Sequence, residues 1–201
     1  MSLGRNVHNA VAVVFKTLQS IEKLMIKIRA ELDEEKYYMP ADRFMRYNSD
    51  VSWEGWIYWS FILLFQRKED GEVMENGWIN GPVYAVEINI DSDTCDEPEL
   101  IVAKMNFGDI SDWNKGCSPS NHTLFYDAIH ANKDIYEVKS ENSDYAWVGV
   151  KVGSEENTFW GFENMVYAIK DLMTVNQGNY KDKIFGTIEE LSKVSTVPVE
   201  K

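Results

Sequence analysis

The sequence predicts an α+β fold: a mainly antiparallel sheet of about four to six strands with helices packed mainly on one face. Residues 54–66 place aromatic and branched apolar side chains on both faces of a strand, which is typical of a strand central to a sheet. Two more predicted strands follow with short connections, which favour antiparallel pairing. We expect residues 1–201 to form a single domain.

The first predicted element is a long helix over residues 6–34. Its apolar residues recur at alternating steps of four and three, at Val7, Val11, Val14, Leu18, Ile21, Met25, Ile28 and Leu32. This stripe predicts an amphipathic helix, and further apolar residues beside it favour docking on the sheet of the same chain. The repeat also suits a coiled coil, so assembly through this helix is an alternative.

The remaining elements follow from alternation, helical periodicity and turn residues. We expect strands at 54–66, 82–91, 100–107, 135–138 and 145–152, and helices at 119–131, 162–173 and 180–194. Ser118 and Pro119 are a favourable cap and first residue for the helix at 119–131. Trp59 and Phe61 share the apolar face of the first strand and are expected in the core.

The charge disfavours two classes of partner. The chain has 20 basic and 33 acidic residues, a formal charge of −13, which repels nucleic acid and anionic membranes. No apolar run reaches the ~18 residues that cross a bilayer, and no secretory signal is visible. We therefore expect a cytoplasmic protein with reduced cysteines, a monomer or homodimer whose partner is a protein or a small molecule.

A candidate ligand site lies on the polar sides of three predicted strands. Its residues are Glu87, Asn89, Lys104, Asn106, Trp147 and Lys151, each opposite the apolar face of its strand. If the strands are neighbours, these side chains form a polar floor that suits a ligand. The alternative is the solvated side of an ordinary antiparallel sheet.

The order of the elements resembles the core of the PD-(D/E)XK nucleases: helix, three-strand meander, crossover helix, strand. That resemblance implies a metal-dependent site with a carboxylate on the second strand, here Glu87, and a Glu-x-Lys or Asp-x-Lys motif on the third. Lys104 matches the lysine, but Val102 replaces its carboxylate. The Glu-x-Lys triplets at 34–36 and 137–139 lie outside the third strand. A degenerate nuclease or hydrolase is thus an alternative, without cleavage expected.

Other constellations carry weaker signals. His122, Tyr126 and His130 share one helical face, with Cys117 and Asp127 nearby, and could supply zinc ligands or a Cys117–His122 pair. The loop at 91–99 offers oxygen ligands without the spacing of a calcium loop. The tryptophans at 53, 56 and 59 alternate faces and form no sugar-stacking platform. We expect no metal and no cofactor.

These observations favour a non-catalytic cytoplasmic binding or interaction protein with an acidic surface. The alternatives are the degenerate nuclease and an assembly protein that dimerises through its N-terminal helix. The sequence contains no catalytic motif, so an enzyme is the less favoured class.

Overall fold

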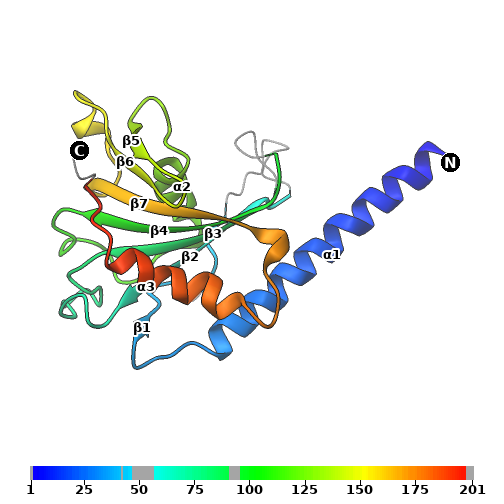
Figure 1. Cartoon of the computed structure of the whole chain (residues 1–201), viewed down its shortest axis with the longest axis horizontal. Coiled ribbons are helices and arrows are strands. Elements are labelled where there is room, and N and C mark those ends of the chain that lie inside the picture. Colours follow the sequence, from blue (N-terminus) through cyan, green and yellow to red (C-terminus); the bar gives the residue numbers. More distant parts are fainter. Residues whose placement is uncertain (1, 42, 47–56, 91–95, 198–201) are drawn as a thin grey trace. The chain divides into compact units, whose positions relative to one another are not determined.

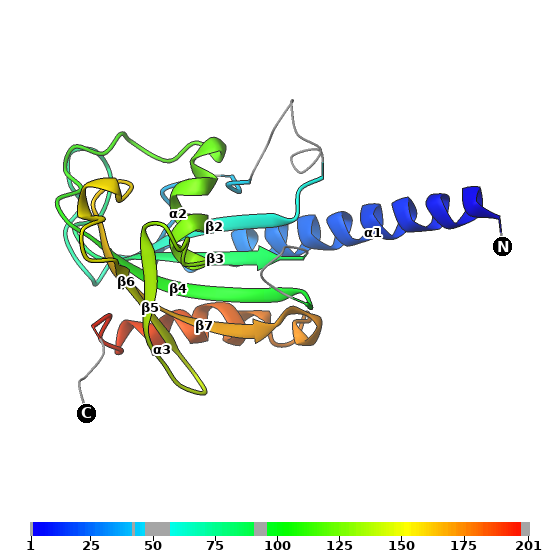
Figure 2. The same ribbon diagram turned by 90° about the horizontal axis from the view of Figure 1, so that it is seen from above.

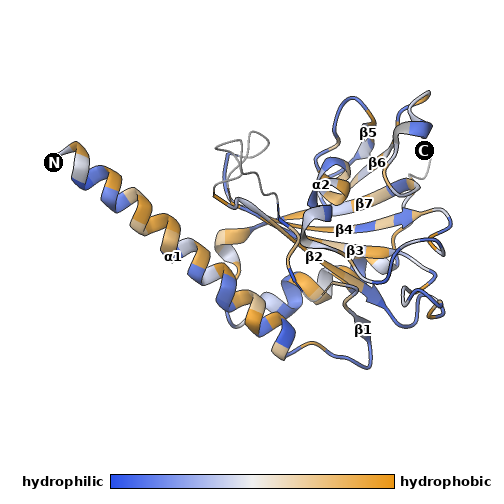
Figure 3. Cartoon of the chain, turned by 180° about the vertical axis from the view of Figure 1, so that it is seen from behind, coloured by the Kyte–Doolittle hydropathy of each residue, from blue (hydrophilic) through white to orange (hydrophobic). Residues whose placement is uncertain are grey.

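The computed structural model describes residues 2–41, 43–46, 57–90 and 96–197, and the chain divides into two compact units, residues 1–35 and 36–201. In the first unit, α1 (Leu3–Ala30) confirms the predicted N-terminal helix. The Ser2 hydroxyl caps it by accepting a hydrogen bond from the backbone N–H of Arg5. Apolar residues recur along the helix (Figure 3). Its docking on the sheet and its pairing with a second copy both stay predictions.

The second unit is built on a seven-stranded sheet, counted over the described residues, in which every strand pair is antiparallel. The strands are β1 (Tyr37–Tyr38), β2 (Ser60–Arg67), β3 (Val83–Asn89), β4 (Glu99–Phe107), β5 (Tyr136–Glu141), β6 (Ala146–Val150) and β7 (Phe162–Asp171). Their order across the sheet is β1-β2-β3-β4-β7-β6-β5 (Figure 1). The fold is α+β as predicted, but the sheet is larger than four to six strands.

Short helical segments complete this unit. They are η2 (Pro119–Asn121), α2 (His122–Ile129), η3 (Glu155–Asn157), η4 (Leu172–Thr174), the π-helical η5 (Asp182–Gly186) and α3 (Thr187–Ser192). The predicted helices at 119–131 and 180–194 are confirmed, with Ser118 as the cap of the first. Among the described residues, no helix combines the length and the apolar character that crossing a membrane requires.

The predicted helix at 162–173 is wrong, because this segment forms β7 between β4 and β6. Adjacent residues Met165 and Val166 are both buried, one on each face of the sheet. A strand covered on both faces reads as a continuous apolar run, which periodicity alone cannot distinguish from a buried helix. The missed strand also moves the centre of the sheet from β2 to β4.

Helices cover both faces of the sheet, so the prediction that they pack mainly on one face is wrong (Figures 1 and 2). Ile62 and Leu64 of β2 pack in one core with Phe125 of α2. Phe65 points to the opposite face, where its ring centroid lies 5.6 Å from that of Phe185 in η5. The central strands are apolar on both sides, and each side therefore requires cover from water.

The start of β2 separates the two aromatic residues that were expected in the core. Phe61 is 5% exposed, as predicted. Trp59 precedes the first strand residue, Ser60, and is half-buried, so its assignment to the main core is wrong. Outside the strand, the alternation of faces no longer determines where a side chain points. The Trp59 ring instead packs edge-on against Tyr126 of α2, at 5.2 Å between centroids.

Candidate functional site

The six residues of the predicted polar floor do not share one face. Residues directly opposite each other on antiparallel strands project to the same side of a sheet. Lys104 is opposite Tyr84, and Glu87 is opposite Ile101. Because Tyr84 and Glu87 are three positions apart on one strand, their side chains lie on opposite faces. The register therefore places Glu87 on the α2 side and Lys104 on the α3 side.

Three of the six hold the C-terminal segment against the α3 side of the sheet. Lys104 Nζ donates to the backbone carbonyls of residues 192 and 194, at 3.1 and 2.9 Å. Asn106 donates to the Thr196 hydroxyl at 2.6 Å, and Trp147 Nε1 donates to the residue 195 carbonyl at 2.9 Å. Burial lowers the pKa of Lys104. These contacts give the three side chains a structural role in the chain itself.

The α2 side of the sheet carries a buried polar network centred on Glu87, a residue with no exposed surface. The Ser60 hydroxyl donates to Glu87 Oε1 at 2.5 Å, and His130 Nε2 lies 2.8 Å from Glu87 Oε2. Ser60 Oγ also lies 2.8 Å from His122 Nε2. The groups form a chain in the order His122, Ser60, Glu87, His130. The carboxylate is satisfied on both oxygens, as burial of its charge requires.

The protons in this network follow from its connectivity. Ser60 has one hydroxyl proton, which it donates to Glu87, so His122 must donate its own Nε2–H to Ser60. His122 Nδ1 is then a lone pair, buried without a hydrogen-bond partner among the described residues. Burial, together with the charge of His130, lowers the pKa of His122 to about 4. His122 is therefore neutral near pH 7.

Aromatic packing fixes both imidazoles. Tyr126 lies between the two histidines, its ring centroid 5.1 Å from His122 in a stacked arrangement and 4.2 Å from His130. The spacing of four residues along the helix produces this column, because such residues lie on one face. His122 and His130 are thus held apart by an aromatic ring, and each contacts a different member of the network.

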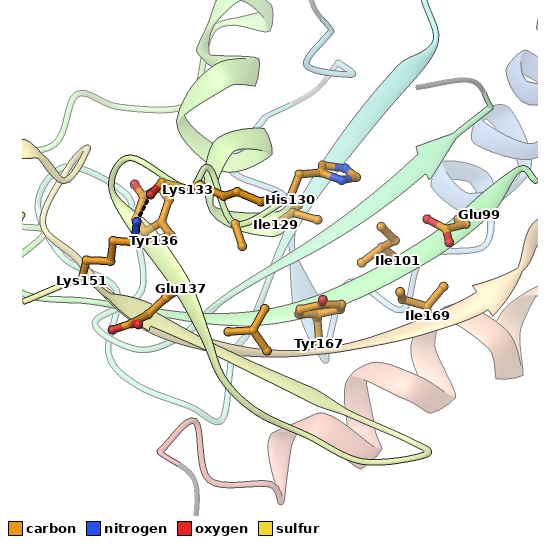
Figure 4. Close-up of a pocket in the computed structure, with 12 residues that line it drawn as sticks. Glu99, Ile101, Ile129, His130, Lys133, Tyr136, Glu137, Lys151, Tyr167 and Ile169 are labelled. Carbon is orange, nitrogen blue, oxygen red and sulfur yellow. Dashed lines mark hydrogen bonds between the residues drawn. The ribbon is translucent and has the colours of Figure 1, made fainter. Parts of the chain in front are cut away.

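A pocket of about 410 Å³ opens beside His130 (Figure 4). Its apolar lining comes from four elements: Ile129 at the end of α2, Ile101 of β4, Val138 of β5 and Ile169 of β7. Glu99, the first residue of β4, also lines it. An apolar cavity wall with a few polar groups is typical of small-molecule sites.

The polar groups of the pocket are divided between its two ends. Glu99 and His130 lie toward one end, and Lys133, Glu137 and Lys151 lie toward the other (Figure 4). Lys151, the one pocket-lining member of the predicted floor, donates its ammonium to the carbonyl of Lys133. Glu137 forms an ion pair with Lys139. At this second end, Lys151 and Glu137 thus already have partners within the chain, and Lys133 is exposed to solvent.

Asn89 is the other residue of the predicted floor that belongs to β3. It is fully buried and lies opposite Glu99 on β4. Asn89 and Glu87 thus lie on the face that carries the pocket, whereas only Lys151 of the other four reaches it. The six predicted residues are divided between a pocket region and a structural region.

Among the described residues, neither Ser60 nor the predicted Cys117–His122 pair is arranged as a nucleophile. Ser60 is 1% exposed, and its hydroxyl donates directly to the Glu87 carboxylate. A nucleophilic serine instead donates to a histidine that a carboxylate orients. Cys117 Sγ lies 3.4 Å from Asn121 Oδ1, whereas His122 is bonded to Ser60. Burial raises the pKa of the Cys117 thiol to about 12, which opposes formation of the nucleophilic thiolate.

The residue groups considered as possible metal sites are not arranged as such in the described parts of the chain. Over residues 2–41, 43–46, 57–90 and 96–197, no group of three or more His, Cys, Asp or Glu side chains is arranged to hold a metal ion. Residues 91–95 of the acidic loop, Trp53 and Trp56 lie outside the described residues. For the nuclease resemblance, Glu87 and Lys104 lie on opposite faces and do not converge.

Sequence reasoning identified the helical face of His122 and His130 but not what it contacts. The alternation of β3 placed Glu87 correctly on the face opposite Tyr84. The missing signal was that α2 covers this same face, because strand alternation does not tell which side a distant helix covers. A carboxylate at the centre of an apolar strand was the one sequence feature that could have indicated the network.

No protein-family model, curated protein or solved structure matches this chain.

Proposed function

We propose that this protein is a non-catalytic binding protein of the cytoplasm that takes a small, partly apolar ligand into the pocket beside His130. One observation carries the proposal: a fully buried carboxylate, Glu87, holds a histidine at the wall of a pocket of about 410 Å³. Burying a charge is costly. The contacts of Ser60 and His130 with the Glu87 carboxylate offset that cost. The result is a polar group of fixed orientation at an otherwise apolar wall.

The pocket suits a ligand with an apolar body. Ile101, Ile129 and Ile169 supply branched side chains that do not hydrogen-bond, and the Tyr167 ring lies among them (Figure 4). Affinity would come from burial of apolar ligand surface, at about 25 cal/mol per Å². Orientation would come from the polar groups at the two ends.

Binding is favoured over catalysis by the state of the reactive groups. The Ser60 hydroxyl is buried and engaged with Glu87, and the Cys117 thiol has a raised pKa because of burial. The formal charge of −13 further favours a small molecule or a protein over nucleic acid as the partner.

The proposal is tested by titrating ¹⁵N-labelled protein with three neutral probes, benzyl alcohol, cyclohexanol and indole. We expect dissociation constants of about 1–10 mM, as small fragments of this size give. The amide shifts should be concentrated at Ile101, His130 and Ile169, which come from three different elements but line one pocket.

A pocket-filling variant provides the control. Ile169 is 49% exposed, so Ile169→Trp adds bulk to the pocket wall without disturbing the core. Val152 is 91% exposed and does not line the pocket, so Val152→Trp is the matched substitution. Binding weakened about tenfold by the first variant alone supports the proposal. Saturable shifts elsewhere, or no shift with any probe, contradict it.

A further inference from the structure

Glu99 is a carboxylate that lines the pocket. Its side chain is half-buried, and among the described residues it makes no hydrogen bond and no ion pair. Burial raises its pKa, the charge of Glu87 raises it further, and the charge of His130 lowers it. A carboxylate that has lost part of its hydration without gaining a protein partner gains most from a cationic ligand.

The register surrounds Glu99 with further negative charge. Asp171, the last residue of β7, is directly opposite Glu99 on the neighbouring strand, so the two carboxylates project from the same side of the sheet. Like charges in this position destabilise a sheet. On the other neighbouring strand, Asn89 is opposite Glu99, and Glu87 lies two residues before Asn89 and projects to the same side. Glu99 is thus the carboxylate that lines this end of the pocket, with Asp171 beside it on the same side of the sheet and Glu87 buried behind it.

The other end offers weaker attraction for an anion. Lys133 is exposed and hydrated, and the Lys151 ammonium donates to a backbone carbonyl. An exposed ammonium gains little from an added ion pair, since water screens the interaction. The end that carries Glu99 is partly desolvated, whereas the end that carries Lys133 is exposed to solvent.

We infer that the ligand of this pocket is an organic cation, a small molecule with a primary ammonium group on a short apolar body, whose ammonium binds Glu99. This inference rests on the proposed function and names the chemical class of its ligand. The apolar body occupies the isoleucine-lined space, and the ammonium pairs with Glu99 on the side of the sheet from which Asp171 also projects.

The test compares three probes that share one phenyl ring and differ in charge: benzylamine, benzyl alcohol and benzoate. Isothermal titration or NMR at pH 7.5 and low salt should give benzylamine a dissociation constant about tenfold below that of benzyl alcohol, with benzoate weakest. Glu99→Gln should remove the advantage of benzylamine and leave benzyl alcohol within about threefold.

The matched control is Glu137→Gln, which removes one negative charge from the opposite end of the same pocket. It should change benzylamine affinity by less than about threefold. Equal effects of the two variants, or benzoate binding as tightly as benzylamine, would overturn the cation assignment while the pocket stands. Failure of all three phenyl probes to bind at the pocket would overturn the proposed function together with it.

Discussion

Glu87 Oε2 lies 2.8 Å from His130 Nε2, although 43 residues separate the two in sequence. Glu87 comes from the centre of β3, and His130 follows the last residue of α2. The contact ties the helix to the sheet and places an imidazole at the pocket wall. The pair therefore contributes to stability and, in the proposed function, also orients a group at the pocket wall.

Removing the Glu87 carboxylate should destabilise the fold. Glu87→Ala leaves Ser60 and His130 without their buried acceptor, and we expect a loss of about 3–5 kcal/mol in the free energy of unfolding. Glu87→Gln keeps one acceptor oxygen and should cost less, about 1–3 kcal/mol. Urea denaturation followed by tryptophan fluorescence measures both.

Glu137→Ala serves as the control for Glu87, because its carboxylate is paired with Lys139 at the surface and should matter by less than about 1 kcal/mol. A Glu87→Ala variant as stable as this control would show that the buried network contributes nothing to folding.

Titration of His122 should make stability depend on pH. Its pKa is lowered from 6.5 to about 4 in the folded protein, because burial disfavours the charged ring. Below pH 6.5 the unfolded chain binds a proton that the folded protein does not, so stability falls as the pH decreases from 6.5 toward 4. The loss is on the order of 2 kcal/mol at pH 5 and about 3 kcal/mol at pH 4.

The measurement is the urea midpoint at pH 7.5 and pH 5, in the native protein and in His122→Gln. The glutamine amide can still donate to Ser60 but does not titrate, so its pH-dependent loss should be smaller. His8→Gln, on α1, is the control and should behave as the native protein does. Equal pH dependence in all three proteins would remove His122 as the cause.

Cys117 should resist thiol reagents in the folded protein. Burial raises its pKa to about 12, so at pH 8 the thiolate fraction is roughly a thousandfold below that of a free cysteine. The experiment uses the Cys95→Ser background, Ellman's reagent, and a sample unfolded in guanidinium as the fully reactive reference. Labelling of the folded protein at the rate of the unfolded one would contradict the burial of this thiol.

Phe61 and Trp59 should differ in their contribution to stability. Phe61 is 5% exposed on β2, and Phe61→Ala should cost about 3–5 kcal/mol. Trp59 is half-buried outside the strand, so Trp59→Ala should cost less despite the larger ring that is removed. Chemical denaturation of both variants gives the ranking, and the reverse order would return Trp59 to the main core.

The sequence predicted the elements whose pattern is local. The amphipathic period identified α1, the alternation of apolar residues identified β3 and β4, and Ser118 marked the start of the helix that contains α2. In each case the signal lies within one segment, because helical and strand periods are set by the backbone. β7 escaped this reasoning, since burial on both faces removes the alternation that marks a strand.

Only the tertiary structure decided which side chains meet. The sequence alone placed Glu87 and Lys104 opposite the apolar residues of their own strands, but it contained no information on the register between those strands. A shift of one residue in register exchanges the two faces, and this register placed Glu87 with His130 and Lys104 with the C-terminal segment. Composition thus determined the acidic charge and local residue patterns the α+β class, whereas strand register and the helix on each face determined the pocket.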